Sequence, residues 1–330
     1  MALEGFMQSR KGVQEPRTAQ QGRPGIMTGT TRYSEPDPAS KEFEISFRDE
    51  DNVTQTDRQN AERSVAALVA RAKEAAEQDR AAEAGLVELT DPLNAPFRKL
   101  IEEDPHAVKA LEKLRTCELL KLSDTTDTLQ HDEPLATPDV SPRAESGFAP
   151  PYDFDWNFHI DHPPVKKTHD RFTGALQLEA RSGLVDEGAP GRVIAHAGCG
   201  VWMVFENPGK KFPRAFLNPG SFAFHVKTVG VGSNATSEGG FELAVFEDGR
   251  FLTSASRRLW RSRISGFEEA QGRDGPLSIT TPNVEFNLRP GHGYSVNAFI
   301  WVVTDRSTGV GAAAAVSRIS ARMPRMSVIS

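Results

Sequence analysis

From Tyr152 onward the sequence repeats one pattern, in which apolar and polar side chains alternate over short segments. Its clearest stretch runs from Arg192 to Asn207. Because successive side chains of a strand point in opposite directions, large apolar residues occupy both faces of this stretch. They are Val201, Met203 and Phe205 on one face, and Trp202 and Val204 on the other. Such a pattern predicts a strand covered on both sides, either unbroken or split near Gly198 and Gly200.

Segments of the same style continue to near the C-terminus. An Asp-Gly pair at 248–249 lies between two of them and is a strong signal for a hairpin turn. Residues 311–323 fit either a helix or a strand, and we favour a strand because the neighbouring segments are strands. About nine or ten strands in about 180 residues, without a long helical insert, predict an antiparallel sandwich or a jelly-roll-like domain over residues 152–330.

The front of the chain differs in composition. Residues 1–55 are rich in Gln, Arg, Gly, Pro, Ser and Thr and predict a disordered segment, with one short alternating stretch at Phe43–Phe47 that fits a strand. Residues 123–151 are acidic and studded with proline, as is typical of a linker. The expected fold class is therefore α+β by region, with a helical region over 56–122 between these two segments.

Three helices are expected in that region. A capping-box pattern from Thr56 to Gln59 begins the first, and Gly85 is a natural end for it. Asp-Pro pairs at 91–92 and 104–105 predict the starts of two more. The first helix, over 56–84, is Ala-rich with a thin apolar stripe, so it needs a partner, either within the chain or on a second copy.

The balance of basic and acidic residues also changes near residue 151. Residues 151–330 hold 20 basic and 17 acidic residues, which leaves 19 of the 39 basic and 28 of the 45 acidic residues for the front part. Cys117 and Cys199 lie in different regions, so a disulfide framework is not expected. The N-terminus lacks the apolar run of a signal peptide, and no segment is apolar for long enough to span a membrane. A cytoplasmic location is the default expectation, with leaderless export left open.

The densest group of potential metal ligands lies between residues 152 and 170. His159 and Asp161 form an H-x-D pair whose side chains point the same way on a strand, as a chelating pair requires. With a distal His292, or His225, this pair would complete a two-histidine, one-carboxylate site for a divalent metal such as Fe or Zn on a jelly-roll scaffold. The simpler interpretation is a polar strand edge with surface histidines and aspartates.

Arginines cluster around Trp260. Regular alternation would place Arg257, Arg261 and Arg263 on one face of a strand and Arg258 on the other. Such a row of guanidinium groups could bind phosphates, sulfated sugars or a protein surface, and the simpler interpretation is a solvated face. A nucleic-acid partner is not expected, because the net charge of +3 over 151–330 is small for such binders. Trp156, flanked by polar residues, is the candidate for stacking on a sugar ring.

No nucleophile motif or phosphate loop is present in the sequence. We therefore expect a binding or structural module without catalytic activity or cofactor, which recognises a protein or carbohydrate surface and is tethered by the helical arm. Two alternatives remain. One is the metal-dependent enzyme centred on His159, Asp161 and His292. The other is a component or cargo of a larger assembly, with homo-oligomers formed through the 56–84 helix.

Overall fold

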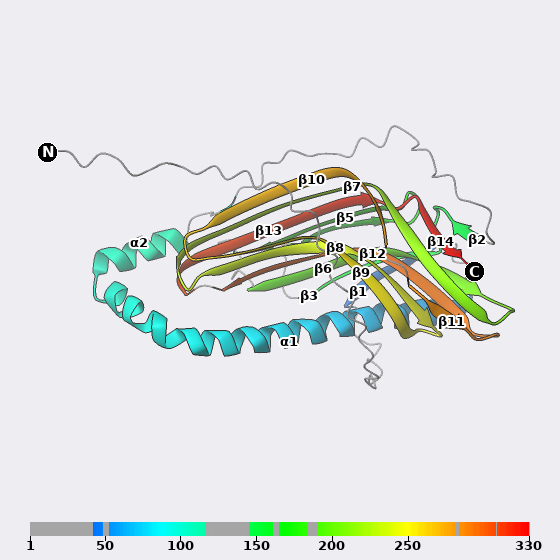
Figure 1. Cartoon of the computed structure of the whole chain (residues 1–330), viewed down its shortest axis with the longest axis horizontal. Coiled ribbons are helices and arrows are strands. Elements are labelled where there is room, and N and C mark those ends of the chain that lie inside the picture. The colour runs from blue at the N-terminus through cyan, green and yellow to red at the C-terminus, as the bar shows by residue number, and fades with distance from the viewer. Residues whose placement is uncertain are drawn as a thin grey trace. The chain divides into compact units, whose positions relative to one another are not determined.

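A computed structural model describes residues 42–48, 53–115, 120, 145–160, 165–183, 191–281, 284–307 and 309–329. They all belong to one compact unit, Pro36–Ser330. Two antiparallel sheets pack face to face, and a long helix crosses the outer side of one of them (Figure 1). This confirms the expected β-sandwich. The predictions for residues 1–41 and for most of the 123–151 linker lie outside the described residues.

The first sheet has six strands in the order β1-β3-β6-β12-β8-β9, and all neighbouring strands are antiparallel. Its strands are β1 (Phe43–Phe47), β3 (Phe154–Ile160), β6 (Arg192–Val204), β8 (Asn234–Glu247), β9 (Arg250–Ser265) and β12 (Gly293–Ser307). The turn between β8 and β9 contains Asp248 at φ 51° and Gly249 at φ 79°. Two consecutive positive φ angles are typical of a tight hairpin turn, so the predicted Asp-Gly turn is confirmed.

The second sheet has eight strands, six of them in the order β2-β14-β7-β13-β5-β4. Its strands are β2 (Glu145–Phe148), β4 (Val165–Asp170), β5 (Ala175–Ser182), β7 (Gly209–Val231), β10 (Glu269–Thr280), β11 (Phe286–Leu288), β13 (Val310–Arg322) and β14 (Arg325–Ile329). The 23-residue β7 pairs with β13 and β14 and also with β10 and β11. Strand β13 covers the ambiguous 311–323 segment, so the preference for a strand there is confirmed.

The main core lies between the sheets. It takes alternate residues of β6, such as Val193 and Val201, together with Leu178 of β5 and Ile319 of β13. The opposite face of β6 is covered as the sequence predicted, except at Val204 at the end of the strand, which is exposed. Strand β6 is unbroken at its two glycines. Gly198 and Gly200 have no side chain, which leaves room on that face for the rings of Trp156 and Phe154.

Helix α1 (Gln55–Glu102) supplies the second cover. Its first half buries Val65, Leu68 and Val69 against aromatic residues of the first sheet, among them Trp156 and Phe246. The 56–84 segment is therefore not a free arm. Its apolar stripe already has an intramolecular partner, which overturns the prediction that homo-oligomers form through that stripe.

The helix begins and ends elsewhere than predicted. Thr54 is the N-cap, and its Oγ1 accepts a hydrogen bond of 3.1 Å from the backbone N–H of Asp57. The helix continues through Gly85, Pro92 and Pro96, so the first two predicted helices are one. A glycine costs only about 1 kcal/mol within a helix, and the prolines lie where the helix is solvent-exposed. Neither described helix combines the length and the hydropathy needed to cross a bilayer.

Helix α2 (Pro105–Arg115) starts at the predicted Asp-Pro pair. Asp104 Oδ1 accepts a hydrogen bond of 2.8 Å from the backbone N–H of His106. Beyond the helix, Leu120 packs on Ala314 and Val316, on the outer side of the second sheet. The helical region therefore contacts both sheets.

Four strands fall outside the sequence predictions, namely β2, β4, β10 and β14. Strand β2 lies inside the predicted linker and pairs with β14. Strands β4 and β10 are polar, with sequences VKKTHD and EAQGRDGPLSIT, so apolar alternation does not reveal them. Strand β1, in contrast, is the short alternating stretch identified in the sequence, and all of its residues pair with β3, from Phe154 to Phe158.

The cover by α1 gives a direct test. Val65 of α1 is fully buried between the helix and the first sheet, whereas Val204, at the end of β6, is 73% exposed. We expect Val65→Ala to lower the free energy of unfolding by about 2 kcal/mol, from lost burial and a new cavity. The same change at Val204 should cost less than about 0.5 kcal/mol. Urea denaturation of both variants measures this. Equal costs would mean that α1 does not cover the sheet.

Farther along α1 an ion-pair network joins the helix to the end of the first sheet. The guanidinium of Arg192 contacts Asp79 of α1 and lies 3.4 Å from Asp305 Oδ2 of β12. Burial raises the pKa of Asp305 to about 6, and the nearby Glu83 adds to this effect while Arg192 opposes it. The folded protein therefore holds a proton on Asp305 more tightly than the unfolded chain does.

A raised carboxyl pKa contributes stability at low pH that is lost as the pH rises from about 4 to about 6. Asp305→Asn mimics the protonated acid at every pH. We expect the stability of this variant relative to the native chain to increase by about 2–3 kcal/mol between pH 4 and pH 7. Urea denaturation at several pH values measures the difference, with Asp274→Asn on the exposed part of β10 as the control substitution. A difference that does not change with pH would contradict the assignment.

Candidate functional site

The predicted metal ligands do not converge. His159 pairs with Ala195 of β6, whereas Gly293, next to His292, pairs with Val204. Nine residues of β6 separate these positions, roughly 30 Å at about 3.3 Å per residue. Asp161 lies outside the described residues. Across the ranges that the structure describes, no three His, Cys, Asp or Glu side chains are placed to hold a metal ion.

Each histidine proposed as the distal ligand has a carboxylate partner elsewhere. His292 Nδ1 lies 2.6 Å from Asp248 Oδ2 in the β8–β9 turn. His225 Nε2 lies 2.7 Å from Glu269 Oε1, on the second sheet. Sequence spacing could not show that His159 of β3 and His292, just before β12, lie far apart along the same sheet.

Trp156 is not a sugar platform. Its side chain is fully buried beneath α1, where Nε1 donates a hydrogen bond of 2.9 Å to Asn297 Oδ1. Its ring stacks on Phe158, with the two centroids 5.8 Å apart. Flanking polar residues suggested exposure, but those residues point to the other face of β3, towards the second sheet.

That other face of β3 carries a polar cluster, which we call the edge cluster. It comprises Glu44 of β1, Asp155, Asn157 and His159 of β3, and Lys167 and His169 of β4. Because β1 and β3 belong to the first sheet and β4 to the second, the cluster bridges the sheets at an open side of the sandwich. The 152–170 segment therefore does gather histidines and carboxylates, although not the predicted set.

The contacts of the edge cluster form a chain. Asn157 Nδ2 donates a 2.7 Å hydrogen bond to Glu44 Oε2 and lies 2.5 Å from His169 Nε2. His169 Nδ1 lies 3.3 Å from Asp155 Oδ1, and the backbone N–H of Arg171 donates to Asp155 Oδ2 at 2.8 Å. Asp155 and Asn157 are buried. The Asn157–His169 contact and the hydrogen bond from Arg171 tie β3 to the β4 segment, whereas Asp155 Oδ1 and His169 Nδ1 face each other without a hydrogen bond.

The edge cluster also contains a contact between a lysine and an imidazole. Lys167 Nζ lies 3.1 Å from His159 Nδ1. Burial lowers the pKa of Lys167, while the Glu44 carboxylate opposes that shift. The sequence identified His159 and His169, but Glu44 lies more than a hundred residues away, and only the pairing of β1 with β3 brings it here.

The edge cluster offers no activated nucleophile. Cys199 pairs directly with Asp155 across β3 and β6 and is fully buried. Burial raises the pKa of the Cys199 thiol well above its usual value, and Asp155 raises it further. The sulfur is therefore a neutral thiol at physiological pH, since the thiolate is the reactive form.

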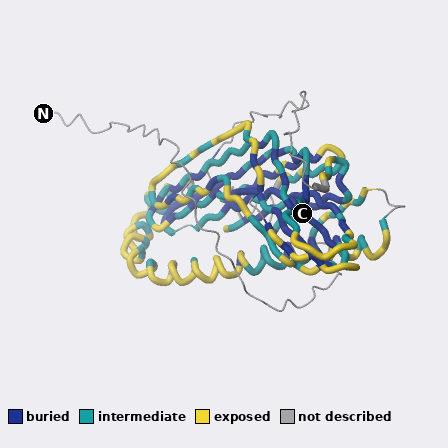
Figure 2. Tube along the Cα trace, turned by 45° about the vertical axis from the view of Figure 1, so that its right-hand side comes forward, coloured by how far each residue is buried: buried dark blue, intermediate teal, exposed yellow. Residues whose placement is uncertain are grey.

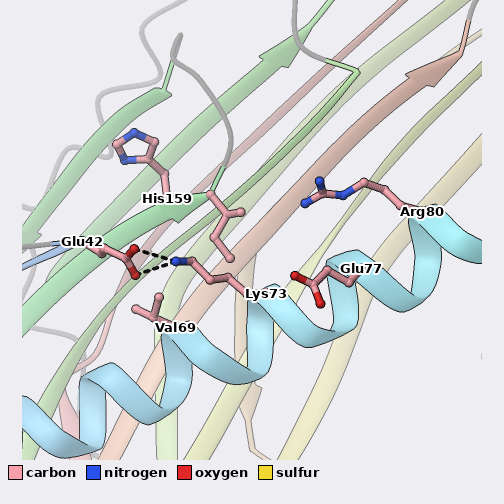
Figure 3. Close-up of a pocket in the computed structure, with 7 residues that line it drawn as sticks. Glu42, Val69, Lys73, Glu77, Arg80 and His159 are labelled. Atoms are coloured by element: carbon pink, nitrogen blue, oxygen red, sulfur yellow. Dashed lines mark hydrogen bonds and ion pairs between the residues drawn. The ribbon is translucent and has the colours of Figure 1, made fainter. Parts of the chain in front are cut away.

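A hollow of about 510 Å³ lies beside the cluster, between α1 and the end of β3. Figure 3 shows Lys73, Glu77 and Arg80 along the helix, with the ring of His159 turned away from it. Lys73 Nζ contacts both carboxylate oxygens of Glu42, at 2.6 and 2.7 Å. Two basic and two acidic side chains line the hollow, so their charges balance and favour neither an anion nor a cation.

The arginines of β9 are exposed, but the register of the strand differs from the prediction. Trp260 pairs with Gly239 and Arg258 with Gly240, so Leu259 is an extra residue that forms a bulge. The bulge reverses the alternation and places Arg258 on the same face as Arg261 and Arg263.

Contacts with a single carboxylate agree with that register. The Nε atoms of Arg258 and Arg261 lie 3.3 and 3.6 Å from Glu238 Oε2, and both arginine side chains are about half exposed. Arg257 instead pairs with Phe241, whose side chain points into the core between the sheets. We call Arg258, Arg261 and Arg263 the arginine row.

The edge cluster yields a test by double-mutant cycle. We expect Asp155→Ala and His169→Ala to be coupled by about 1 kcal/mol or more in the free energy of unfolding, because the two side chains meet in a buried network. The control pair is His225 and Glu269, an imidazole–carboxylate contact on the surface, for which coupling of about 0.5 kcal/mol or less is expected. Additive effects at Asp155 and His169 would show that the cluster does not clamp the sheets.

Comparison with known proteins assigns no family to this geometry. No family model matches the chain, and no curated protein matches it in sequence. What the chain does is therefore inferred from its own contacts and charges.

Proposed function

We propose that this chain is a non-enzymatic protein-recognition module that binds an acidic segment of a partner protein along strand β9. The observation that carries the proposal is the arginine row. Three guanidinium groups share one face of an exposed strand, and a single carboxylate, Glu238, lies between two of them.

The position of β9 supports an extended partner. It is the last strand of the first sheet, and among the described residues its ladder runs only to β8, so one backbone edge remains available. A peptide that adds to such an edge gains main-chain hydrogen bonds, and its alternate side chains face the row. Arginine suits this role because its planar fork pairs with carboxylates through two hydrogen bonds.

Carbohydrate recognition is the weaker alternative, since its proposed platform, Trp156, is buried. A polyanion such as nucleic acid would also be attracted to arginine. It would, however, require a larger basic surface than three side chains around one glutamate.

The test uses the full chain and a fluorescein-labelled peptide of twelve residues in which Glu alternates with Ser. Fluorescence anisotropy should show binding that weakens as salt increases. Arg258→Gln combined with Arg261→Gln and Arg263→Gln should weaken binding by about tenfold, since exposed ion pairs contribute up to about 1 kcal/mol each. The control changes Lys109, Lys113 and Lys166 to Gln, which removes the same charge elsewhere, and should alter binding by less than about twofold.

Two results would overturn the proposal. One is an affinity that the arginine variant does not change. The other is tighter binding of a twelve-nucleotide single strand than of the peptide, with loss in the same variant, because the row would then be a nucleic-acid site.

A further inference from the structure

The second half of α1 carries an uncovered apolar stripe. Leu86, Leu89, Leu93, Phe97 and Leu100 are 45%, 75%, 70%, 48% and 65% exposed. At 3.6 residues per turn these positions stay within about 80° of one another around the helix axis. Figure 2 shows this half of the helix as exposed, in contrast to the half that lies on the sheet. Five large apolar side chains on one helix face form a larger patch than monomeric proteins usually leave in water.

The stripe continues the face that docks on the sheet. Leu93 follows Leu68 by about seven helical turns, so both point to the same side of α1. Leu68 is buried on the first sheet, whereas Leu93 lies beyond the part of the sheet that covers this face. The uncovered stripe therefore needs a partner from outside the sheet.

We propose that the stripe binds the same stripe of a second copy, with the two helices antiparallel and Leu93 at the two-fold axis. The spacing of the five residues along the chain is three, four, four and three, which reads the same in both directions. A two-fold interface requires such self-complementarity, because each residue must meet its symmetry mate. Leu86 then lies opposite Leu100, and Leu89 lies opposite Phe97.

Charge disfavours the parallel direction. Residues 83–91 contain Glu83, Glu88 and Asp91 and no basic residue, so a parallel pair would place like charges together. In an antiparallel pair the facing residues 95–103 contain Arg98 and Lys99 as well as Glu102 and Glu103, and Glu88 lies opposite Arg98.

The area is adequate for a specific contact. Full burial of these five side chains in both copies would remove about 1,000 Å² of surface from water, which is near the lower limit for stable protein interfaces. The other occupants within reach are the chain's own segments. Neither residues 1–41 nor 121–144 contain five large apolar residues at helical spacing, so neither sequence matches the stripe.

Light scattering coupled to gel filtration of the full chain should give about twice the chain mass of 36.1 kDa at micromolar concentration. Leu89→Glu with Leu93→Glu should weaken dimerisation at least about 100-fold, since two apolar anchors per copy become charged. The control, Val204→Glu with Phe267→Glu, changes residues that are 73% and 75% exposed and should stay dimeric. Circular dichroism verifies that both variants are folded.

Cysteine crosslinking tests the geometry in a Cys117→Ser background, in which Cys199 is buried. Leu93→Cys should form a disulfide-linked dimer on mild oxidation, because the two copies of residue 93 face each other. Leu86→Cys should crosslink only when mixed with Leu100→Cys. Crosslinking of Leu86→Cys with itself would show a parallel pair and reject the proposal.

A monomeric native chain would also overturn it, and would show that another segment or protein covers the stripe. Peptide binding by the arginine row does not depend on this contact. Loss of the dimer with peptide binding retained therefore contradicts this inference alone, and the reverse result contradicts only the proposed function.

Discussion

The cover of the first sheet by α1 is the constraint on which the other arrangements depend. Strand β6 carries apolar residues on both faces, and β3 carries them on the face turned away from the second sheet, so the second sheet cannot bury them all. The outer face would otherwise expose aromatic rings such as Trp156 and Phe246 to water. The first half of α1 meets that need and cannot also serve as a free tether. Sugar stacking by Trp156 and oligomerisation through the apolar stripe of 56–84 both require exposed side chains, and this one packing contact buries those side chains.

Much of the sheet could be predicted from the sequence, because apolar alternation reports burial directly. Strands β3, β6 and β12 and the Asp-Gly hairpin follow from it. The polar strands β4 and β10 do not, because they form through backbone hydrogen bonds to β5 and β7 rather than through an apolar face. Local signals also predicted helix ends that the structure does not contain. Gly85 and Pro92 are ordinary helix terminators, but both lie within α1, which the sheet holds from its first half onward.

The location of the candidate site could be predicted from the sequence, but the set of residues that forms it could not. The 152–170 segment does contain the histidines and carboxylates of a polar network. Its partner Glu44 comes from a distant strand, and His292 lies at the far end of the sheet, and both facts depend on strand order. The position of Arg258 in the arginine row could not be predicted from the sequence either. One extra residue, Leu259, moves Arg258 to the face opposite the one that regular alternation gives it.

The order of the strands also bears on how the chain is made. Strand β12 lies between β6 and β8, and β13 lies between β7 and β5, so the central strand of each sheet comes from the last part of the sequence. Until β12 and β13 are present, β6 and β8, and likewise β5 and β7, each lack one ladder partner. Unpaired edges of this kind readily associate with other chains. Each sheet therefore closes only when a later strand enters between strands made earlier.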